Sequence, residues 1–277
     1  MLSGCNRLLR AVIATEIEFY LHGAGTKFSP EQVTAIIREA CVKDNIPLAS
    51  VEQERGKDQY EIALLPSSDK DLIIKDTERF KVLLKATFAD YSINVDFSAK
   101  PLPNEPGSGL HIHIHLEDDN EKNLFTRDGD EFSKILLYSI GGLFETMNAN
   151  MAIFAPNQAS YLRFTDKSNA PTTVSWGTNN RTVAIRLPDK PMDNKHIEHR
   201  VSGSDADIAS VIEAILSGIE YGIANKCNPG APIYGDASLP QYALPKLARS
   251  LEEARSYREE SKLLFSDFTK SIASAND

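Results

Sequence analysis

Acidic side chains and histidines recur at alternate positions in this sequence, a spacing that could gather them at one site. Glu16 and Glu18 are separated by one residue, Ile17, in an apolar stretch. Three histidines alternate with apolar residues in L-H-I-H-I-H-L at 110–116. On a β-strand this alternation directs the polar side chains to one face. Segments at 51–66 and 196–201 supply further acids. We therefore expect one polar sheet face with six candidate ligands, which are Glu16, Glu18, Glu54, Glu61, His111 and Glu198.

Metal binding is the chemistry that such a set favours. Five carboxylates in one cleft repel one another, and the repulsion disfavours their ionised forms unless cations are present. Oxygen ligands with a single imidazole suit hard divalent ions such as Mg²⁺ or Mn²⁺ better than zinc. Other interpretations stay open at this point. Glu16 and Glu18 alone could form a solvated strand edge, and the three histidines could form a hydrogen-bonded polar face or a hydrolase-type metal site.

Four arginines form a second set: Arg163, Arg181, Arg186 and Arg200. Arg200 lies two residues after Glu198, so on a strand their side chains share one face. The pair could form a structural salt bridge. Alternatively, guanidinium groups bind carboxylate or phosphate oxygens in a bidentate manner, which suits transfer chemistry between anions.

The elements that must position these residues follow from periodicity. Strands are predicted at 12–21, 51–66, 110–116, 181–187 and 196–201, and helices at 30–42, 71–91, 131–147, 208–223 and 247–271. Ser29 before Pro30 suits a helix N-cap. Gly141, Gly142 and Gly218 could let two apolar helices pack closely.

Composition excludes some classes of function. The 277 residues include 30 basic and 39 acidic side chains, with a net charge of −9, whereas nucleic-acid-binding domains concentrate basic charge. Cys5, Cys41 and Cys227 form no disulfide framework or zinc motif, which favours a reducing compartment. Glu16 and Glu18 interrupt the N-terminal apolar stretch before it could act as a signal or membrane span. We expect a cytoplasmic protein with no membrane or nucleic-acid partner.

Taken in order, six short motifs resemble the catalytic domain of the glutamine synthetase family. They are E-I-E-F-Y-L at 16–21, Glu54 with Q-Y-E at 59–61, G-S-G-L-H-I-H at 107–113, S-Y-L-R at 160–163, N-R-T-V-A-I-R-L-P at 180–188 and I-E-H-R at 197–200. N-P-G-A-P at 228–232 and S-L-E-E-A at 250–254 extend the likeness toward the C-terminus. Glu52 lies close to Glu54, and the step from 54 to 61 decides for Glu54. The resemblance covers nearly the whole chain.

The resemblance implies a fold and a set of roles. The fold would be a single α+β catalytic domain over residues 1–277, with a curved, mainly antiparallel sheet and helices packed outside. Two cations, Mg²⁺ or Mn²⁺, would bind. Glu18, Glu54 and Glu61 would hold the ion nearer the acid substrate, and Glu16, His111 and Glu198 the ion beneath the ATP phosphates. The phosphates would be attended by His113, Arg181 and Arg186, and the acid substrate or the transferring phosphoryl group by Arg163 and Arg200.

Some positions depart from the family pattern. His115 and His196 stand near the expected nucleotide site where the family usually has serine and arginine. Asn169 replaces a glutamate that precedes Ala-Pro in the family. The family's N-terminal β-rich domain, which lends an acidic loop to the neighbouring subunit, has no room before Glu16. Ammonium binding needs both acids, so the resemblance implies an amine other than ammonia, and a smaller homo-oligomer rather than a twelve-subunit ring.

The leading hypothesis is thus an ATP-dependent ligase that joins a glutamate-like acid to an amine through a γ-glutamyl phosphate. A second hypothesis is a catalytically silent relative that keeps the nucleotide and metal pocket and acts in binding or regulation. A third is a metal-dependent hydrolase that uses His111, His113 and His115. The order of the six motifs argues against the third.

Overall fold

The computed structural model describes residues 9–128, 131–164, 170–190 and 195–261. Within them, an eight-stranded sheet has the order β2-β3-β1-β5-β10-β9-β8, and β4 pairs with β1. The strands are β1 (Arg10–His22), β2 (Leu48–Gln53), β3 (Gln59–Leu64), β4 (Asn94–Asp96), β5 (Leu110–Glu117), β8 (Trp176–Thr178), β9 (Ile185–Leu187) and β10 (Ile197–His199), with a separate hairpin of β6 (Arg127–Asp128) and β7 (Glu131–Phe132).

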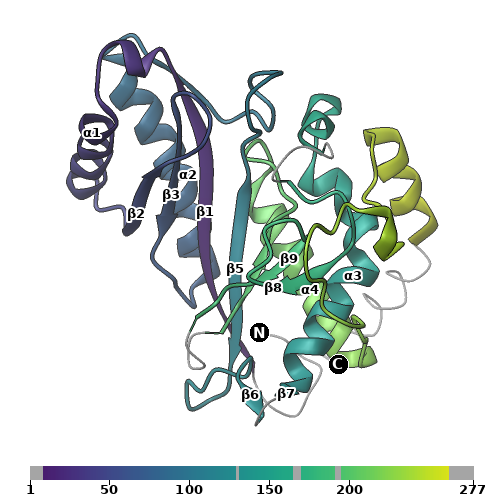
Figure 1. Cartoon of the computed structure of the whole chain (residues 1–277). Helices are drawn as coiled ribbons and strands as arrows, with labels where there is room; N and C mark the ends of the chain where they lie inside the picture. The colour runs from purple at the N-terminus through teal and green to yellow at the C-terminus, as the bar shows by residue number, and fades with distance from the viewer. Residues whose placement is uncertain (1–8, 129–130, 165–169, 191–194, 262–277) are drawn as a thin grey trace.

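The sheet is mainly antiparallel, as the sequence predicts. Within it only β8 and β9 pair in parallel among the described strands. The long strands β1 and β5 run side by side through the centre, with α1 and α2 on one flank and α3 and α4 on the other (Figure 1). The helices are α1 (Pro30–Lys43), α2 (Lys70–Ala89), α3 (Lys134–Phe154) and α4 (Ile208–Asn225), and residues 251–261 form a further helical segment.

Alternation in β1 divides the sheet into an apolar face and a polar face. Ile17 and Phe19 are fully buried, and the Thr15 hydroxyl on the same face lies 3.1 Å from that of Thr77 in α2. Glu16 and Glu18 occupy the alternate positions and point to the opposite face. Burial of the apolar face thus fixes the orientation of the polar one, because a slip of one residue would reverse every side chain.

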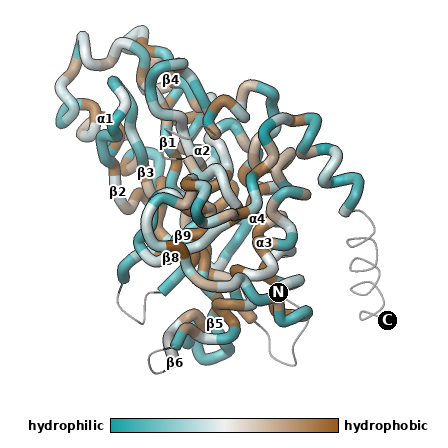
Figure 2. Tube along the Cα trace, turned by 45° about the vertical axis from the view of Figure 1, so that its right-hand side comes forward, coloured by the Kyte–Doolittle hydropathy of each residue, from teal (hydrophilic) through white to brown (hydrophobic). Residues whose placement is uncertain are grey.

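The cap of α1 and the packing of α3 on α4 agree with the sequence. Ser29 caps α1 through a reciprocal capping box with Gln32. Helices α3 and α4 meet through glycines: a Cβ added at Gly142 would lie 2.1 Å from the Gly218 carbonyl oxygen. Figure 2 shows hydrophobic stretches through α3, α4 and the strands beside them. By length and composition, α4 is the one helix among the described residues that could span a membrane, but this packing identifies it as a core helix.

Several predicted elements differ from the observed ones. The strand predicted at 51–66 is two strands, β2 and β3, because a turn at 54–58 reverses the chain. The strand predicted at 181–187 is limited to Ile185–Leu187, and the helix predicted from 131 begins only at Lys134, after β7. The predicted C-terminal helix starts at 251 rather than 247, and its part beyond 261 lies outside the described residues.

Candidate functional site

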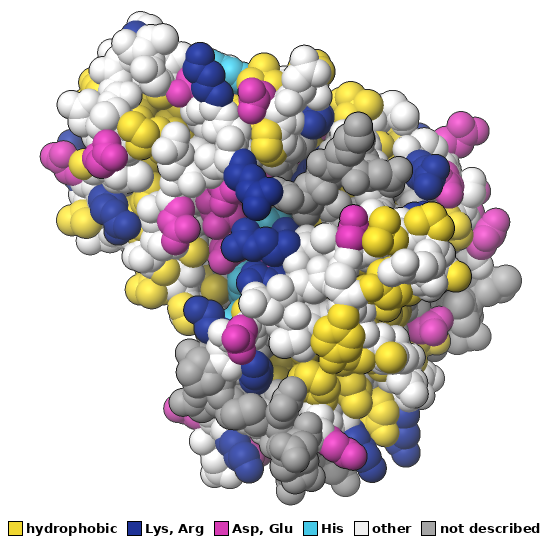
Figure 3. All heavy atoms as spheres, in the orientation of Figure 1, with side chains coloured by type: hydrophobic (Ala, Val, Ile, Leu, Met, Phe, Trp, Pro, Cys, Tyr) yellow, Lys and Arg dark blue, Asp and Glu magenta, His cyan; other side chains and the backbone are white. Residues whose placement is uncertain are grey.

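The register of the central strands brings the predicted ligands onto one face. Glu16 lies opposite His111 across β1 and β5, and Glu18 opposite Glu61 across β1 and β3. On the other side of β5, Glu198 in β10 pairs with His113. Figure 3 shows acidic, basic and histidine side chains gathered in a hollow at the centre of this view. Six residues from the four strands β1, β3, β5 and β10 thus lie close together through strand pairing alone.

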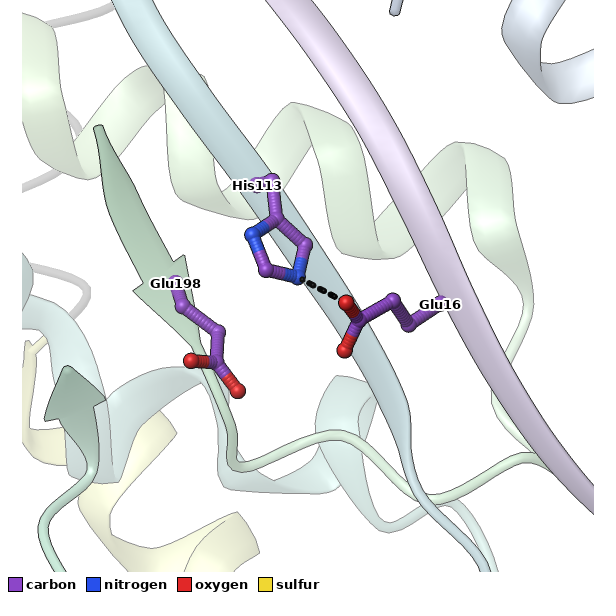
Figure 4. Close-up of side chains that lie close together, drawn as sticks. All are labelled: Glu16, His113 and Glu198. Carbon is purple, nitrogen blue, oxygen red and sulfur yellow. Dashed lines mark ion pairs between the residues drawn. The ribbon is translucent and has the colours of Figure 1, made fainter. Parts of the chain in front are cut away.

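The centre of the site is a cluster of carboxylates and imidazoles. His111 Nδ1 lies 3.6 Å from Glu16 Oε2 and 3.8 Å from Glu198 Oε1, and His113 Nε2 lies 3.1 Å from Glu16 Oε1. Figure 4 shows Glu16, His113 and Glu198 pointing toward one another from three strands. Candidate ligand atoms lie within 4.8 Å of one another in two groups: Glu16, His113 and Glu198, and Glu16, Glu61 and His111.

Electrostatics in this cluster are unbalanced. Burial raises the pKa of Glu61 far above its ordinary value, and repulsion from Glu16 and Glu18 adds to the effect. For Glu16, burial also raises the pKa, but the neighbouring imidazoles of His111 and His113 outweigh this effect and lower the pKa. The His111 ring is 3% exposed, and neither of its nitrogens has a hydrogen-bond partner among the described residues. Buried polar atoms of this kind are uncommon, and together with crowded carboxylates they fit a divalent cation.

Glu198 is paired with two arginines. Arg186 Nη1 lies 2.7 Å from Glu198 Oε2, and Arg200 Nη1 donates to Glu198 Oε1. Burial raises the pKa of Glu198, but the nearby charges, with Arg200 first, lower it to about 2. The salt bridge between Glu198 and Arg200 that strand parity allows is therefore present.

Glu18 and Glu54 line a small polar pocket of about 30 Å³ beside the cluster, together with Gln59, His111, Arg163 and Arg200. Glu18 Oε2 accepts a 2.7 Å hydrogen bond from the Gly109 amide. Glu52, the neighbour of Glu54 in sequence, is exposed and does not line the pocket. The pocket therefore contains Glu54 and excludes Glu52.

Arg163 is a buried cation in the wall of this pocket. Its Nη1 donates to the Val201 carbonyl at 2.8 Å and its Nη2 to the Arg200 carbonyl at 3.3 Å. Burial lowers its pKa to about 10, against the effect of Glu18 and Asp205, so it is charged at neutral pH. It forms no ion pair with any described residue. A buried guanidinium without a carboxylate partner is suited to binding an anion.

Gly109 permits the close approach of two site residues. A Cβ at this position would lie 2.4 Å from His111 Nε2 and 2.7 Å from Arg163 Nη2. A side chain at this position would have to displace both of them. In the sequence, G-S-G at 107–109 alone indicates only a turn, so this steric role becomes visible only in the structure.

A larger cavity of about 350 Å³ lies on the other side of the cluster. It is lined by Glu16, His113, His115, Arg186 and His196, among others. The rings of His113 and His196 lie 5.0 Å apart, and His115 Nε2 lies 3.0 Å from Glu117. Its size falls within the range of small-molecule sites.

Two predicted residues stand apart from this arrangement. Arg181 is exposed and lies in a turn rather than on a strand, although its charge acts on Glu54. Asn169 lies outside the described residues. Among the described residues, no candidate metal group contains three histidines, so the hydrolase hypothesis lacks its ligand set.

Sequence reasoning also missed residues that hold the site together. Gln59 is buried and bridges the turns that line the small pocket, because its side chain accepts from the Gly56 amide and donates to the Gly107 carbonyl. Ser204 and Asp205, in a loop without periodicity, contact both sides of the site. The glutamine stands in the motif Q-Y-E and could have been noticed there. The loop residues carry no local signal.

Comparisons with known proteins agree with the fold. The family model for the catalytic domain of glutamine synthetase matches residues 26–275. The γ-glutamylputrescine synthetase PuuA of Escherichia coli (strain K12) is 31% identical over 267 residues, which cover 86% of this chain and 56% of that protein. A glutamate–isopropylamine ligase of Pseudomonas sp is 32% identical over 253 residues, which cover 88% of this chain and 52% of that protein.

Solved structures give the same fold. The structure titled "GmaS/ADP complex-Conformation 1" matches with a TM-score of 0.80 at 22% identity, and covers 91% of this chain and 64% of that one. This chain spans about half the length of the curated relatives it matches. The family-model match at 26–275 contains five of the six motifs, and E-I-E-F-Y-L at 16–21 lies before it. The chain therefore belongs to the glutamine synthetase family, whose catalytic-domain fold it adopts.

Proposed function

We propose that the protein is an ATP- and Mg²⁺- or Mn²⁺-dependent ligase that joins the γ-carboxylate of a glutamate-like acid to an amine through a γ-glutamyl phosphate. One observation carries the proposal: the carboxylate cluster lies between a small pocket with the buried cation Arg163 and a cavity of about 350 Å³ lined by histidines and Arg186. The names of two relatives, a γ-glutamylputrescine synthetase and a glutamate–isopropylamine ligase, support the class of reaction.

The two cation sites take the ligands that the family resemblance implies. Glu18, Glu54 and Glu61 would hold one ion, and the three residues Glu16, His111 and Glu198 the other. The orphaned His111 ring and the crowded carboxylates support this assignment. Bound cations would neutralise the developing charge on the transferring phosphoryl group.

The arginines and remaining histidines surround this centre. Arg163 and Arg200 would bind the acid substrate and the phosphoryl oxygens, which their position in the small pocket supports. His113, Arg186, His115 and His196 line the larger cavity and would attend the nucleotide, with Arg181 at the phosphates. Because positioned charge does most of the work in phosphoryl transfer, the protein needs no covalent nucleophile.

The kind of amine is inferred from Asn169, which in the proposed site would lie beside the incoming amine. A neutral amide offers neither a full negative charge to attract ammonium nor a base to deprotonate it. We therefore propose an amine other than ammonia.

A second candidate function, a catalytically silent relative, is favoured by the ion pairs of Glu198. Arg186 and Arg200 occupy both of its carboxylate oxygens, so a cation must compete with two guanidinium groups for this ligand. If the cation cannot displace them, the protein would keep the pocket but would not catalyse the reaction.

Phosphate release from ATP, measured with glutamate and a panel of amines at millimolar Mg²⁺ or Mn²⁺, tests the proposal. Hydroxylamine in the panel reports the acyl phosphate directly, because it forms a γ-glutamyl hydroxamate. Glutamate-dependent release with at least one amine supports the ligase. Saturable Mn²⁺ and ATP binding without any release would identify the silent relative.

Other expectations stay predictions. We propose that residues 1–277 act as one catalytic domain, in the cytoplasm, on small molecules and not on nucleic acid. Cys41 and Cys227 are free thiols, which suits a reducing compartment. An assembly smaller than a twelve-subunit ring also stays a prediction.

A further inference from the structure

The loop Arg200–Asp205, which follows β10, holds Arg163 from one side. Its first two carbonyls, those of Arg200 and Val201, accept hydrogen bonds from both terminal nitrogens of the buried guanidinium. These bonds fix the end of the side chain. They leave open what fixes the backbone that carries it.

Asp205, at the end of the same loop, anchors that backbone. Its Oδ2 accepts a 2.6 Å hydrogen bond from the Ser160 hydroxyl and a 3.2 Å bond from the Asn157 side-chain amide. Ser160 lies in the 3₁₀ helix Gln158–Arg163, which ends at Arg163, and Asn157 is its N-cap. One loop therefore fixes Arg163 at both its head and its backbone.

The neighbouring Ser204 contacts the part of the site that carries Glu18. Its Oγ lies 2.7 Å from the carbonyl oxygens of Glu18 and Gly109, and its own carbonyl accepts from Lys81 in α2 at 2.8 Å. Gly109 in turn donates to the Glu18 carboxylate. Adjacent residues of one loop thus support different functional groups, Ser204 the acidic strand and Asp205 the arginine turn.

We propose that Asp205 is a positioning residue that holds Arg163 in place to bind the carboxylate of the acid substrate. This inference rests on the proposed function of Arg163. Asp205 itself does not touch the substrate. It acts by a short, charge-assisted hydrogen bond to Ser160, a type stronger than a neutral one, so that the guanidinium is fixed before the acid arrives. Preorganisation of this kind lowers the cost of binding.

The experiment compares glutamate and Mn²⁺ affinities in matched variants of the full chain. Isothermal titration gives the dissociation constant of glutamate in the presence of Mn²⁺, a separate Mn²⁺ titration reports the acidic cluster, and the KM for glutamate in hydroxamate formation gives a kinetic readout. Asp205→Ala and Ser160→Ala each remove one end of the bond, and the second is the smaller change should the first fold poorly. Asp205→Asn keeps an acceptor of the same shape.

We expect Asp205→Ala and Ser160→Ala each to weaken glutamate binding about tenfold, consistent with the loss of one hydrogen bond to a charged group. Mn²⁺ affinity should change less than about twofold. The loss in the double variant should be smaller than the product of the two single losses, because both substitutions remove the bond between Ser160 and Asp205. Asp205→Asn should recover part of the glutamate affinity.

Asp207→Ala is the matched control, because Asp207 lies two residues away and only caps α4 through the Ser210 amide. It should lower the melting temperature and leave glutamate affinity unchanged. The inference would be overturned, and the proposed function left intact, if the parent and Asp205→Ala bound glutamate equally well. The same conclusion would follow if Asp205→Ala lost as much affinity for Mn²⁺ as for glutamate. A parent that binds Mn²⁺ but no glutamate would instead contradict the proposed function, and the inference with it.

Discussion

Glu18 and Glu61 lie directly opposite each other across β1 and β3, so two carboxylates share one position on the polar face of the sheet. Like charges in directly opposed positions destabilise a sheet. Burial and this repulsion raise the pKa of Glu61. The folded protein therefore contains an electrostatic repulsion between buried acids, which a bound cation would reduce.

The first prediction concerns Glu61→Gln in metal-free protein. Neutralising this side chain should raise the unfolding free energy at pH 8 by about 1 kcal/mol, because it removes the cost of burying a charge and the repulsion from Glu16 and Glu18. An acid whose pKa is raised on folding makes its stabilising contribution below its ordinary pKa and loses it as pH rises toward the raised value. In EDTA, the parent should therefore lose stability above about pH 5 relative to the variant.

Chemical denaturation in EDTA at several pH values measures this difference. Glu52→Gln is the control, because Glu52 also pairs with Glu61, across β2 and β3, but is exposed. It should leave stability nearly unchanged. Adding Mn²⁺ should stabilise the parent more than Glu61→Gln, because in the variant only the ion at Glu16, His111 and Glu198 would keep all its ligands. A destabilised Glu61→Gln in EDTA would show that the carboxylate is already compensated without metal.

The second prediction separates two histidines of one strand face. His111→Ala should weaken Mn²⁺ binding by at least about tenfold, the scale of loss seen when even an outer support of a metal site is removed. His115→Ala should not, because His115 pairs with Glu117 and belongs to neither candidate metal group. Mn²⁺ titration followed by electron paramagnetic resonance measures both. Similar losses in the two variants would contradict this division.

Much of the polar face could be predicted from sequence, because a period of two alone assigns side chains to faces of a strand. Glu16, Glu18 and His111 are the clearest cases, since each alternates with residues that the sheet must bury. Periodicity could not predict which residues would lie opposite each other on neighbouring strands. The pairing of Glu18 with Glu61 depends on the register between β1 and β3, and the sequence pattern merges β3 with β2 into one strand.

Periodicity could not place the residues that lie outside regular elements, for a related reason. Glu54 lies just after β2, where parity no longer applies, and only spacing selects it over Glu52. Ser204 and Asp205 act through loop geometry that no periodicity encodes. Arg181 lies in a turn because β9 begins only at Ile185. The local sequence pattern thus predicts which side chains share a face of a strand. Tertiary packing decides which loops contact that face.

The third prediction tests the steric role of Gly109. Gly109→Ala should weaken both Mn²⁺ and glutamate binding, because its Cβ would displace His111 and Arg163 together. Far-ultraviolet circular dichroism should stay close to that of the parent, since the strand around it is unaffected. Loss of only one of the two affinities would show that the other side chain has room to move.

The last prediction is that the protein makes little glutamine from free ammonia. Asn169 carries no charge and no base, whereas ammonium must be attracted and then deprotonated before it can attack an acyl phosphate. Loss of one positioned acid–base group typically costs about 10²–10⁴-fold in rate, so the ratio of ammonia to hydroxylamine turnover should be low. Asn169→Glu should raise this ratio by restoring both functions. Asn169→Gln, with the longer side chain but no charge, should not. Coupled assays of ADP formation with each nucleophile measure the ratio at fixed glutamate and Mg²⁺. Rapid glutamine formation by the parent, or an equal gain in Asn169→Gln, would show that another group serves the amine.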